Sequence, residues 1–111
     1  MIHEMNLHPG PFLSIKNKTK TIEMRLNDEK RSLIKIGDSI VFTNNVSGET
    51  LEVEVIDIKK YRDFKELYKD YNKIEIGYDE DEAPKPSDME MYYSKEKIEK
   101  YGTLAIRVSV I

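Results

Sequence analysis

The sequence predicts an α+β fold, in which about five mostly antiparallel strands form a closed or half-closed β-barrel with short flanking helices. Several short segments alternate apolar and polar residues, as half-buried strands do. No regular crossover helices separate these segments, as a parallel sheet would require. A chain of 111 residues also corresponds to one domain, so we expect residues 1–111 to fold as a single unit.

The composition narrows the class of protein. A net charge of −3 argues against a generally basic nucleic-acid binder, although a local basic patch is compatible with it. The absence of cysteine excludes disulfides, thiolate nucleophiles and zinc–cysteine sites. No apolar run approaches the length of a membrane span, so we expect a cytoplasmic protein without membrane association. The oligomeric state stays open.

The N-terminal part is predicted to contain a strand and a helix. The strand is expected over Met1–Leu7. Pro11 suits the first turn of a helix, to which Phe12 and Ile15 give an apolar side. We expect this helix to end at Asn17, because asparagine tolerates the left-handed backbone conformation.

The next strand carries charged residues. If Thr21–Leu26 is extended, alternate side chains point to opposite faces, so Thr21, Glu23 and Arg25 lie opposite an apolar face. Lys20 has the wrong parity and joins Glu23 and Arg25 only if it lies in the entry turn or in a bulge. The set is then either an anchor for a polar ligand or an exposed ion pair on a solvated strand. The apolar face would consist of Ile22, Met24 and Leu26.

Two further strands are predicted in the middle of the chain. Residues 28–36 form a short helix or a loop, after which a strand is expected over Ser39–Thr43. The turn chemistry of Asn44–Gly48 joins this strand to Leu51–Ile58. The alternation of the second strand breaks at Ile56, which predicts a bulge or a crossing from the sheet edge to the core.

Capping signals place the later helices. Asp63 has capping-box spacing with Glu66, and Ser87 has it with Glu90. Ser94 is expected to cap another short helix. The first of these helices has an apolar stripe that predicts core packing and not an aromatic ligand platform. That stripe consists of Phe64, Leu67, Tyr68 and Tyr71.

The C-terminal part is predicted to end in a strand. Gly102 has the position of a glycine that terminates a helix. In Thr103–Ile111 alternate residues are expected to point inward, with Arg107 and Ser109 outward. The inward residues are Leu104, Ile106, Val108 and Val110.

An acidic segment, Gly77–Asp88, is predicted to be a solvated loop. Its four carboxylates in Asp79–Glu82 superficially resemble a calcium loop, but the glycine and distal glutamate of an EF-hand are out of register. We therefore expect neither a metal nor a cofactor. An alternative is that these carboxylates bind another protein.

Few residues in the chain are suited to catalysis. His3 and His8 are the only histidines, and we expect each to be exposed or satisfied by a hydrogen bond. Singly scattered glycines argue against phosphate-binding loops. Lys20 could act as a base if it is desolvated, and Arg25 could bind phosphate or carboxylate in bidentate fashion.

Three stretches follow known motifs: Lys18–Arg25 is similar to G-x-K-x-x-E-x-R, Ile34–Phe42 to I-x-x-G-D-x-I-x-F, and Tyr101–Ile106 to Y-G-V-L-A-I. In this order they resemble the ASCH domain family, small β-barrels related to the PUA RNA-binding domain. The resemblance implies a PUA-like fold. The family glycine falls on Lys18, so we expect Asn17 to adopt the positive φ of the tight turn.

The resemblance also implies a cleft that binds RNA or a nucleoside or nucleotide. Arg25 and Lys18 are then expected to contact phosphate or the acceptor edge of a base, and phosphate contacts would weaken with salt. Glu23 would accept from an exocyclic amine or a ribose hydroxyl. The full set of expected ligand-binding residues is Lys18, Lys20, Glu23, Arg25 and Tyr93.

Some similar ASCH proteins are enzymes, and one subgroup deacylates N4-acylated cytidines with a lysine base, a threonine nucleophile and a distal glutamate. By this resemblance Lys20 is the base, whereas Glu23 occupies the threonine position. Thr21 would have to replace the nucleophile, and Glu75 loosely matches the distal glutamate. Lys20, Thr21 and Glu23 are thus the catalytic candidates of an amidohydrolase. For a ribonuclease, also attributed to the family, the sequence lacks paired histidines.

Overall fold

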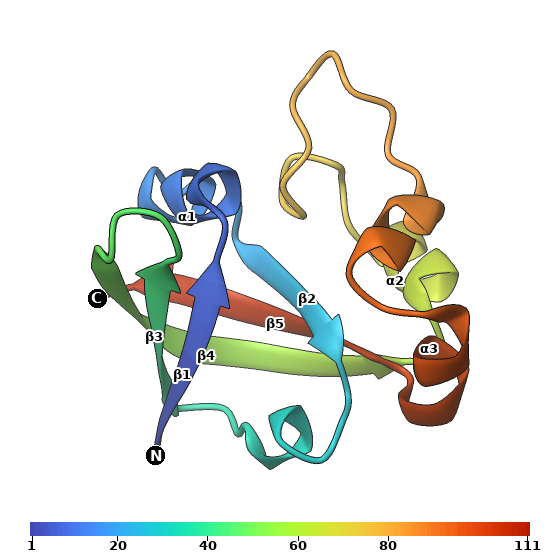
Figure 1. Ribbon diagram of the computed structural model, residues 1–111, viewed down its shortest axis with the longest axis horizontal. Helices are drawn as coiled ribbons and strands as arrows, with labels where there is room; N and C mark the ends of the chain where they lie inside the picture. The colour runs from blue at the N-terminus through green and yellow to red at the C-terminus, as the bar shows by residue number, and fades with distance from the viewer.

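Five strands of the computed structural model, which covers residues 1–111, form one sheet that curls into a half-barrel (Figure 1). The strand order is β1-β3-β4-β5-β2. Only β1 and β3 pair in parallel, and the other three pairs are antiparallel, which confirms the predicted α+β fold. The strands are β1 (Ile2–Leu7), β2 (Ile22–Leu26), β3 (Ser39–Asn44), β4 (Thr50–Tyr61) and β5 (Thr103–Val110).

Short helices flank this sheet. Helix α1 lies beside β1 at one end of the half-barrel, whereas α2 and α3 lie at the far ends of β4 and β5 (Figure 1). The α-helices are α1 (Pro9–Lys16), α2 (Phe64–Asp70) and α3 (Lys95–Tyr101). Two 3₁₀ helices complete the set, η1 (Arg31–Leu33) and η2 (Pro86–Met91).

The half-barrel has an open seam between its edge strands. β1 and β2 are the two ends of the strand order and do not pair with each other. Arg25 spans this seam, because its Nη2 donates to the carbonyl oxygen of Asn6 at 3.0 Å. A side chain of the charged strand therefore links the two edges where a backbone ladder is missing.

Apolar residues form two cores on opposite faces of the sheet. β5 contributes to both, because Leu104 and Ile106 lie in the first core and Ala105 in the second. The predicted inward face of β5 is thus confirmed, but its other face is also covered near Ala105. The first core fills the half-barrel with side chains from all strands except β2, together with Phe12, Ile15 and Ile34. The second packs β2 against the helices and consists of Ile22, Met24, Leu26, Phe64, Leu67, Ile76, Met89, Ile98 and Ala105.

The break of alternation in β4 is a bulge. Val55 pairs with Val108 and Asp57 with Arg107, so Ile56 is the extra residue on its strand. Ile56 is exposed, whereas Ile58 packs against the first core. The bulge shifts the parity of β4 and brings Ile58 inward, as the sequence pattern predicted.

The capping predictions succeed at two helices and fail at a third. The side chain of Asp63 accepts from the amide of Glu66, and that of Ser94 accepts from the amide of Lys97. The Ser87 cap is wrong, because η2 already begins at Pro86 and has no side-chain cap. Proline is preorganised for the first position of a helix, and the helix start at Pro86 is two residues earlier than a cap at Ser87 would give.

The predicted left-handed Asn17 is wrong as well. Asn17 has φ −80°, and Lys18 takes the positive φ of 66° instead. The amide of Lys18 donates to the carbonyl of Ile15, and that of Thr19 to the carbonyl of Ser14. These two bonds form a Schellman motif, in which the residue after the cap is left-handed. Helix α1 therefore ends in a left-handed residue, a position that glycine usually occupies and that Lys18 occupies here.

Candidate functional site

Lys20 lies in the turn that enters β2, as its parity required. The Schellman turn positions Lys20, because the Lys20 amide donates to the Ser14 carbonyl at 3.1 Å. The same carbonyl also accepts the Thr19 amide. The next two amides, of Thr21 and Ile22, donate to the carbonyl of Glu75 at 3.0 Å each. The regular strand begins only at Ile22, so the side chain of Lys20 is free to lie on the face of Glu23.

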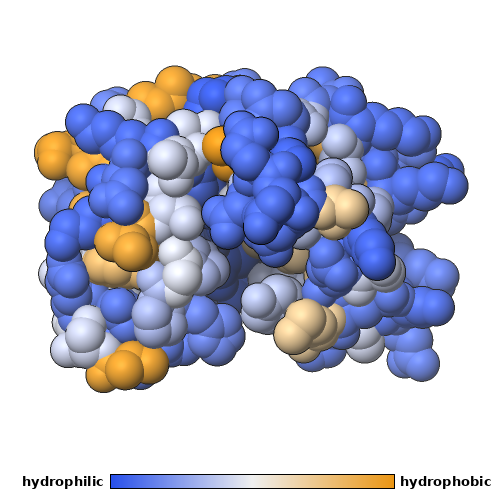
Figure 2. Space-filling view, turned by 90° about the horizontal axis from the view of Figure 1, so that it is seen from above, coloured by the Kyte–Doolittle hydropathy of each residue, from blue (hydrophilic) through white to orange (hydrophobic).

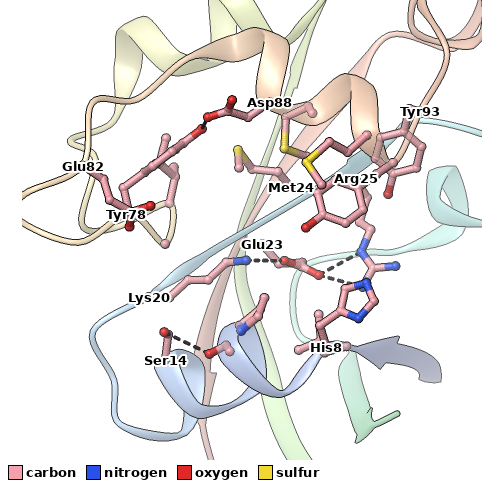
Figure 3. A pocket seen from close by; sticks show the side chains of 18 of the residues that line it. His8, Ser14, Lys20, Glu23, Met24, Arg25, Tyr78, Glu82, Asp88 and Tyr93 are labelled. Atoms are coloured by element: carbon pink, nitrogen blue, oxygen red, sulfur yellow. Dashed lines mark hydrogen bonds and ion pairs between the residues drawn. The ribbon is translucent and has the colours of Figure 1, made fainter. Parts of the chain in front are cut away.

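Glu23 is at the centre of a buried ion-pair network (Figure 3). Lys20 Nζ lies 2.8 Å from Glu23 Oε1. Arg25 Nε and Nη2 lie 2.8 and 2.7 Å from Glu23 Oε2. The side chains of Lys20, Glu23 and Arg25 are only 8%, 3% and 12% exposed, so the alternative of an exposed ion pair on a solvated strand is wrong.

The two cations determine the charge state of this carboxyl. Burial by itself would raise the pKa of Glu23, but the charges and hydrogen bonds of Lys20 and Arg25 outweigh it and lower the pKa to about 2. Burial likewise opposes the charge of Arg25, and Glu23 overcomes it and raises the Arg25 pKa. Glu23 is therefore a carboxylate at neutral pH.

A cavity of about 640 Å³ opens beside this network. Lys20, Glu23 and Arg25 line one side of it, together with His8 and Ser14 from the region of α1. The opposite side is formed by the segment from Ile76 to Tyr93, with its tyrosines, methionines and carboxylates. Figure 2 shows the surface hollowed between these two parts of the molecule. The volume is within the range of roughly 300–1,000 Å³ that is typical of ligand pockets.

Four tyrosines line the opposite side of the cavity and are called the tyrosine wall below: Tyr68, Tyr78, Tyr92 and Tyr93. Hydrogen bonds of Tyr78 hold part of this wall in place. The hydroxyls of Tyr68 and Tyr78 lie 2.9 Å apart. Tyr78 also donates to Asp88 Oδ2 at 2.8 Å, and burial together with these bonds raises the Tyr78 pKa. This chain of bonds ties the loop to α2 and keeps the phenol neutral.

Gly77 packs against the side chain of Lys20, and both residues line the cavity. Its φ is +107°, and an added Cβ would lie 3.1 Å from Lys20 Cδ. A glycine therefore lets the loop approach the lysine stem closely. The aliphatic part of Lys20 is buried under the loop, while Nζ points toward Glu23 (Figure 3).

The structure brings together four of the residues selected from the sequence. Lys20, Glu23, Arg25 and Tyr93 all line the cavity, and burial raises the pKa of Tyr93. Lys18 is exposed in the turn and does not line it.

The two remaining residues of the enzymatic scheme lie elsewhere. Thr21 does not line the cavity, and its hydroxyl is buried without a hydrogen-bond partner. The carboxylate of Glu75 lies on another surface, 3.9 Å from Arg107. The threonine nucleophile and the distal glutamate therefore have no counterpart beside Lys20.

Sequence reasoning missed most of the opposite wall. The sequence pattern places Tyr68 in the apolar stripe of a helix, which it does join, but Tyr68 also lines the cavity. The sequence predicts a solvated loop for Asp79 and Glu82, and both are exposed, yet they line the cavity as well. The cluster of tyrosines in residues 68–93 was the available signal, since aromatic side chains gather in ligand pockets.

The two histidines differ in their surroundings. His3 is buried and its Nε2 lies 2.8 Å from Asp38, which confirms a satisfied histidine, and His8 is exposed. No group of three or more histidine, aspartate or glutamate side chains is arranged to hold a metal ion. None of the helices has the length and apolar character needed to span a membrane.

Comparisons with known proteins agree with the geometry. The model of the ASCH domain family matches residues 5–111. The crystal structure of the hypothetical protein PH0355 is 33% identical, with a TM-score of 0.84 over 100% of both chains. The solution structure of PF0455 from Pyrococcus furiosus is also 33% identical, with a TM-score of 0.78 over 100% of this chain and 98% of that one.

A more distant structure, a mutant of ZmASCH from Zymomonas mobilis, shows the same fold. It is 15% identical, with a TM-score of 0.71 over 97% of this chain and 67% of that one. A search of the curated proteins finds no match. The family model covers nearly the whole chain, and the matched motif carries the buried network of the cavity, so this protein belongs to the ASCH domain family, with its PUA-like fold.

Proposed function

We propose that the cavity binds RNA or a modified nucleoside, with a base inserted between the Lys20–Glu23–Arg25 network and the tyrosine wall. The observation that carries this proposal is the convergence of the three charged side chains on one cavity. A buried carboxylate whose pKa is shifted by neighbouring charges and that borders a cavity is typical of functional sites, so the position of the network favours a ligand site.

The wall residues suit a planar ligand with polar edges. Tyr78, Tyr92 and Tyr93 offer aromatic faces, on which bases stack with about 1–3 kcal/mol each. The network offers N–H donors at fixed positions, because both cations are held by Glu23. A base could therefore be recognised by its shape and by one hydrogen-bonding edge.

Isothermal titration calorimetry tests the proposal. The purified chain is titrated with the four ribonucleosides, with N4-acetylcytidine and with short single-stranded RNAs. The variants are Tyr92→Ala, which removes an exposed aromatic residue of the cavity, and Lys20→Met, which removes a donor and keeps the aliphatic stem. Lys97→Met is the matched control, since Lys97 is an exposed lysine of α3 away from the cavity.

We expect binding of at least one probe, a loss of roughly tenfold or more in both cavity variants, and no change in Lys97→Met. Circular dichroism of each variant confirms that it is folded. If no nucleoside or RNA binds at millimolar concentration, the proposal is wrong. Release of acetate from N4-acetylcytidine that is lost in Lys20→Met would instead establish the amidohydrolase.

A further inference from the structure

The network side of the cavity presents hydrogen-bond donors. Glu23 already accepts an N–H from Lys20 on Oε1 and one from Arg25 Nε on Oε2, and Arg25 Nη2 lies 2.7 Å from the same Oε2, so little acceptor capacity is left on it. Lys20 Nζ uses one of its three hydrogens in this way. Lys20 lines the cavity, and a ligand group that lies against its ammonium must accept a hydrogen bond, because an ammonium only donates.

Arg25 cannot hold a phosphate in the usual two-pronged manner. Its Nε donates to Glu23, and its Nη2 donates to the Asn6 carbonyl and lies 2.7 Å from Glu23 Oε2. The guanidinium also has a side-chain hydrogen bond with Tyr93, whereas bidentate binding needs two free N–H groups on one edge. The arginine that the sequence motif assigns to phosphate therefore has no free pair of donors on one edge to offer.

The opposite wall presents acceptors. Asp79, Glu82 and Asp88 line it, and none of these three carboxylates takes part in an ion pair. The Asp79 carboxylate has no hydrogen bond, and Glu82 accepts only the backbone amide of Asp79. Lys73, the nearby cation, binds backbone carbonyls of Glu80 and Glu82 and leaves the carboxylates uncompensated.

The cavity as a whole is acidic. Two cations and four carboxylates line it, which leaves two net negative charges. Like charges within the Debye length, about 8 Å at physiological ionic strength, repel each other. A phosphate inside the cavity would meet this repulsion without a bidentate partner, whereas hydroxyl or amino groups would find free acceptors.

We infer that the cavity takes an uncharged nucleoside or base and excludes its phosphates. The carbonyl edge of the ligand lies on Lys20 and Arg25, and its hydroxyl or amino donors lie on Asp79 and Glu82. This inference rests on the proposed function and makes it specific. The two walls differ in hydrogen-bonding character, so they also fix the orientation of the bound ligand.

Competition between nucleosides and their 5′-monophosphates tests the inference. Calorimetry with cytidine, uridine, adenosine, guanosine and the four monophosphates is run on the wild-type chain and on the double variant Asp79→Asn/Glu82→Gln. Both replacements keep an oxygen at the same place and remove the charge. Glu80→Gln/Asp81→Asn is the matched control, because it removes the same charge from two exposed residues of the same loop that do not line the cavity.

We expect each monophosphate to bind roughly tenfold or more weakly than its nucleoside, and the gap to close mainly in Asp79→Asn/Glu82→Gln. Raising the salt concentration should also narrow the gap, because it screens the repulsion. Equal or tighter binding of a monophosphate overturns the inference and leaves the proposed function standing. If neither probe binds, and RNA fails too, both are overturned.

Discussion

At the scale of single residues, Glu23 is the group on which the site depends. It lies 3% exposed between two cations that would otherwise face each other in a region of little water. Breaking a buried pair by removing one partner is costly, because the remaining charge is left uncompensated. The same three residues that form the candidate site therefore also stabilise the fold.

Replacing Glu23 with Gln tests this double role. The variant keeps the shape of the side chain but leaves Lys20 and Arg25 without their anion, so we expect a loss of about 3 kcal/mol in the free energy of unfolding, measured with urea. The exposed pair of Lys16 and Glu49 provides the control, and Glu49→Gln should cost less than about 1 kcal/mol. Equal stability of the Glu23→Gln variant and the wild type would contradict the role of the network.

The pH dependence of this difference follows from the pKa of Glu23. Folding lowers this pKa from its ordinary value of 4.5 to about 2, so the folded state favours the carboxylate. Stability from this group is fully present above about pH 4.5 and is lost as the pH falls toward 2. The gap between wild type and Glu23→Gln should therefore be constant near neutrality and shrink between these two values.

Urea unfolding of both proteins from pH 7 to pH 2.5 measures this gap. Asp38, whose pKa is lowered to about 2 mainly by its hydrogen bond with His3, titrates in both proteins and cancels in the difference. A gap that stays constant throughout this range would show that Glu23 does not titrate as its surroundings require.

At the scale of elements, the turn from α1 into β2 decides where Lys20 lies. The carbonyl of Ser14 accepts the amides of Thr19 and Lys20, and the chain can reverse there only because Lys18 adopts φ 66°. A left-handed conformation costs a residue with a Cβ about 1–2 kcal/mol, and glycine avoids this cost. The turn therefore retains strain that its hydrogen bonds offset.

Lys18→Gly is expected to stabilise the protein. Relief of the strain exceeds the greater entropy of the unfolded glycine chain, which gives a net gain of up to about 1 kcal/mol. Asn17→Gly is the control, because Asn17 has an ordinary φ of −80° and glycine there can only lose entropy. Thermal unfolding separates the two variants, and a gain in Asn17→Gly with a loss in Lys18→Gly would contradict the assigned turn.

At the scale of the whole molecule, the cavity lies between a region of regular secondary structure and a loop. One wall belongs to the half-barrel, in which β5 pairs with β4 on one side and β2 on the other. The other wall includes residues 77–85, which form neither helix nor strand. Few of the amides of that loop have backbone partners, so it should open at a lower free energy than the sheet.

Native-state hydrogen exchange by NMR checks this difference. The amides of residues 79–85 should exchange first and those of β5 last, with Tyr78 as the boundary because its hydroxyl is tied to Tyr68 and Asp88. Tyr78→Phe, which removes these bonds, should extend the fast exchange to the amides of positions 77 and 78. Protection of residues 79–85 equal to that of β5 would contradict the lower opening free energy expected for this loop.

The sequence by itself determined the local features of this protein. Alternation located the strands and the bulge at Ile56, capping residues located the starts of α2 and α3, and motif spacing placed Glu23 and Arg25 on one face. These features depend on backbone geometry between near neighbours, which a sequence pattern records directly.

Only the tertiary structure decided what the charged face does. Glu75 and Gly77 cover the turn at Lys20, and Tyr78, Asp79 and Glu82 face the network across more than fifty positions of the chain. No local pattern distinguishes a covered strand face from a solvated one, because burial depends on which distant segment packs over it. The acidity of the cavity arises in the same way, from carboxylates and cations that meet only when the chain is folded.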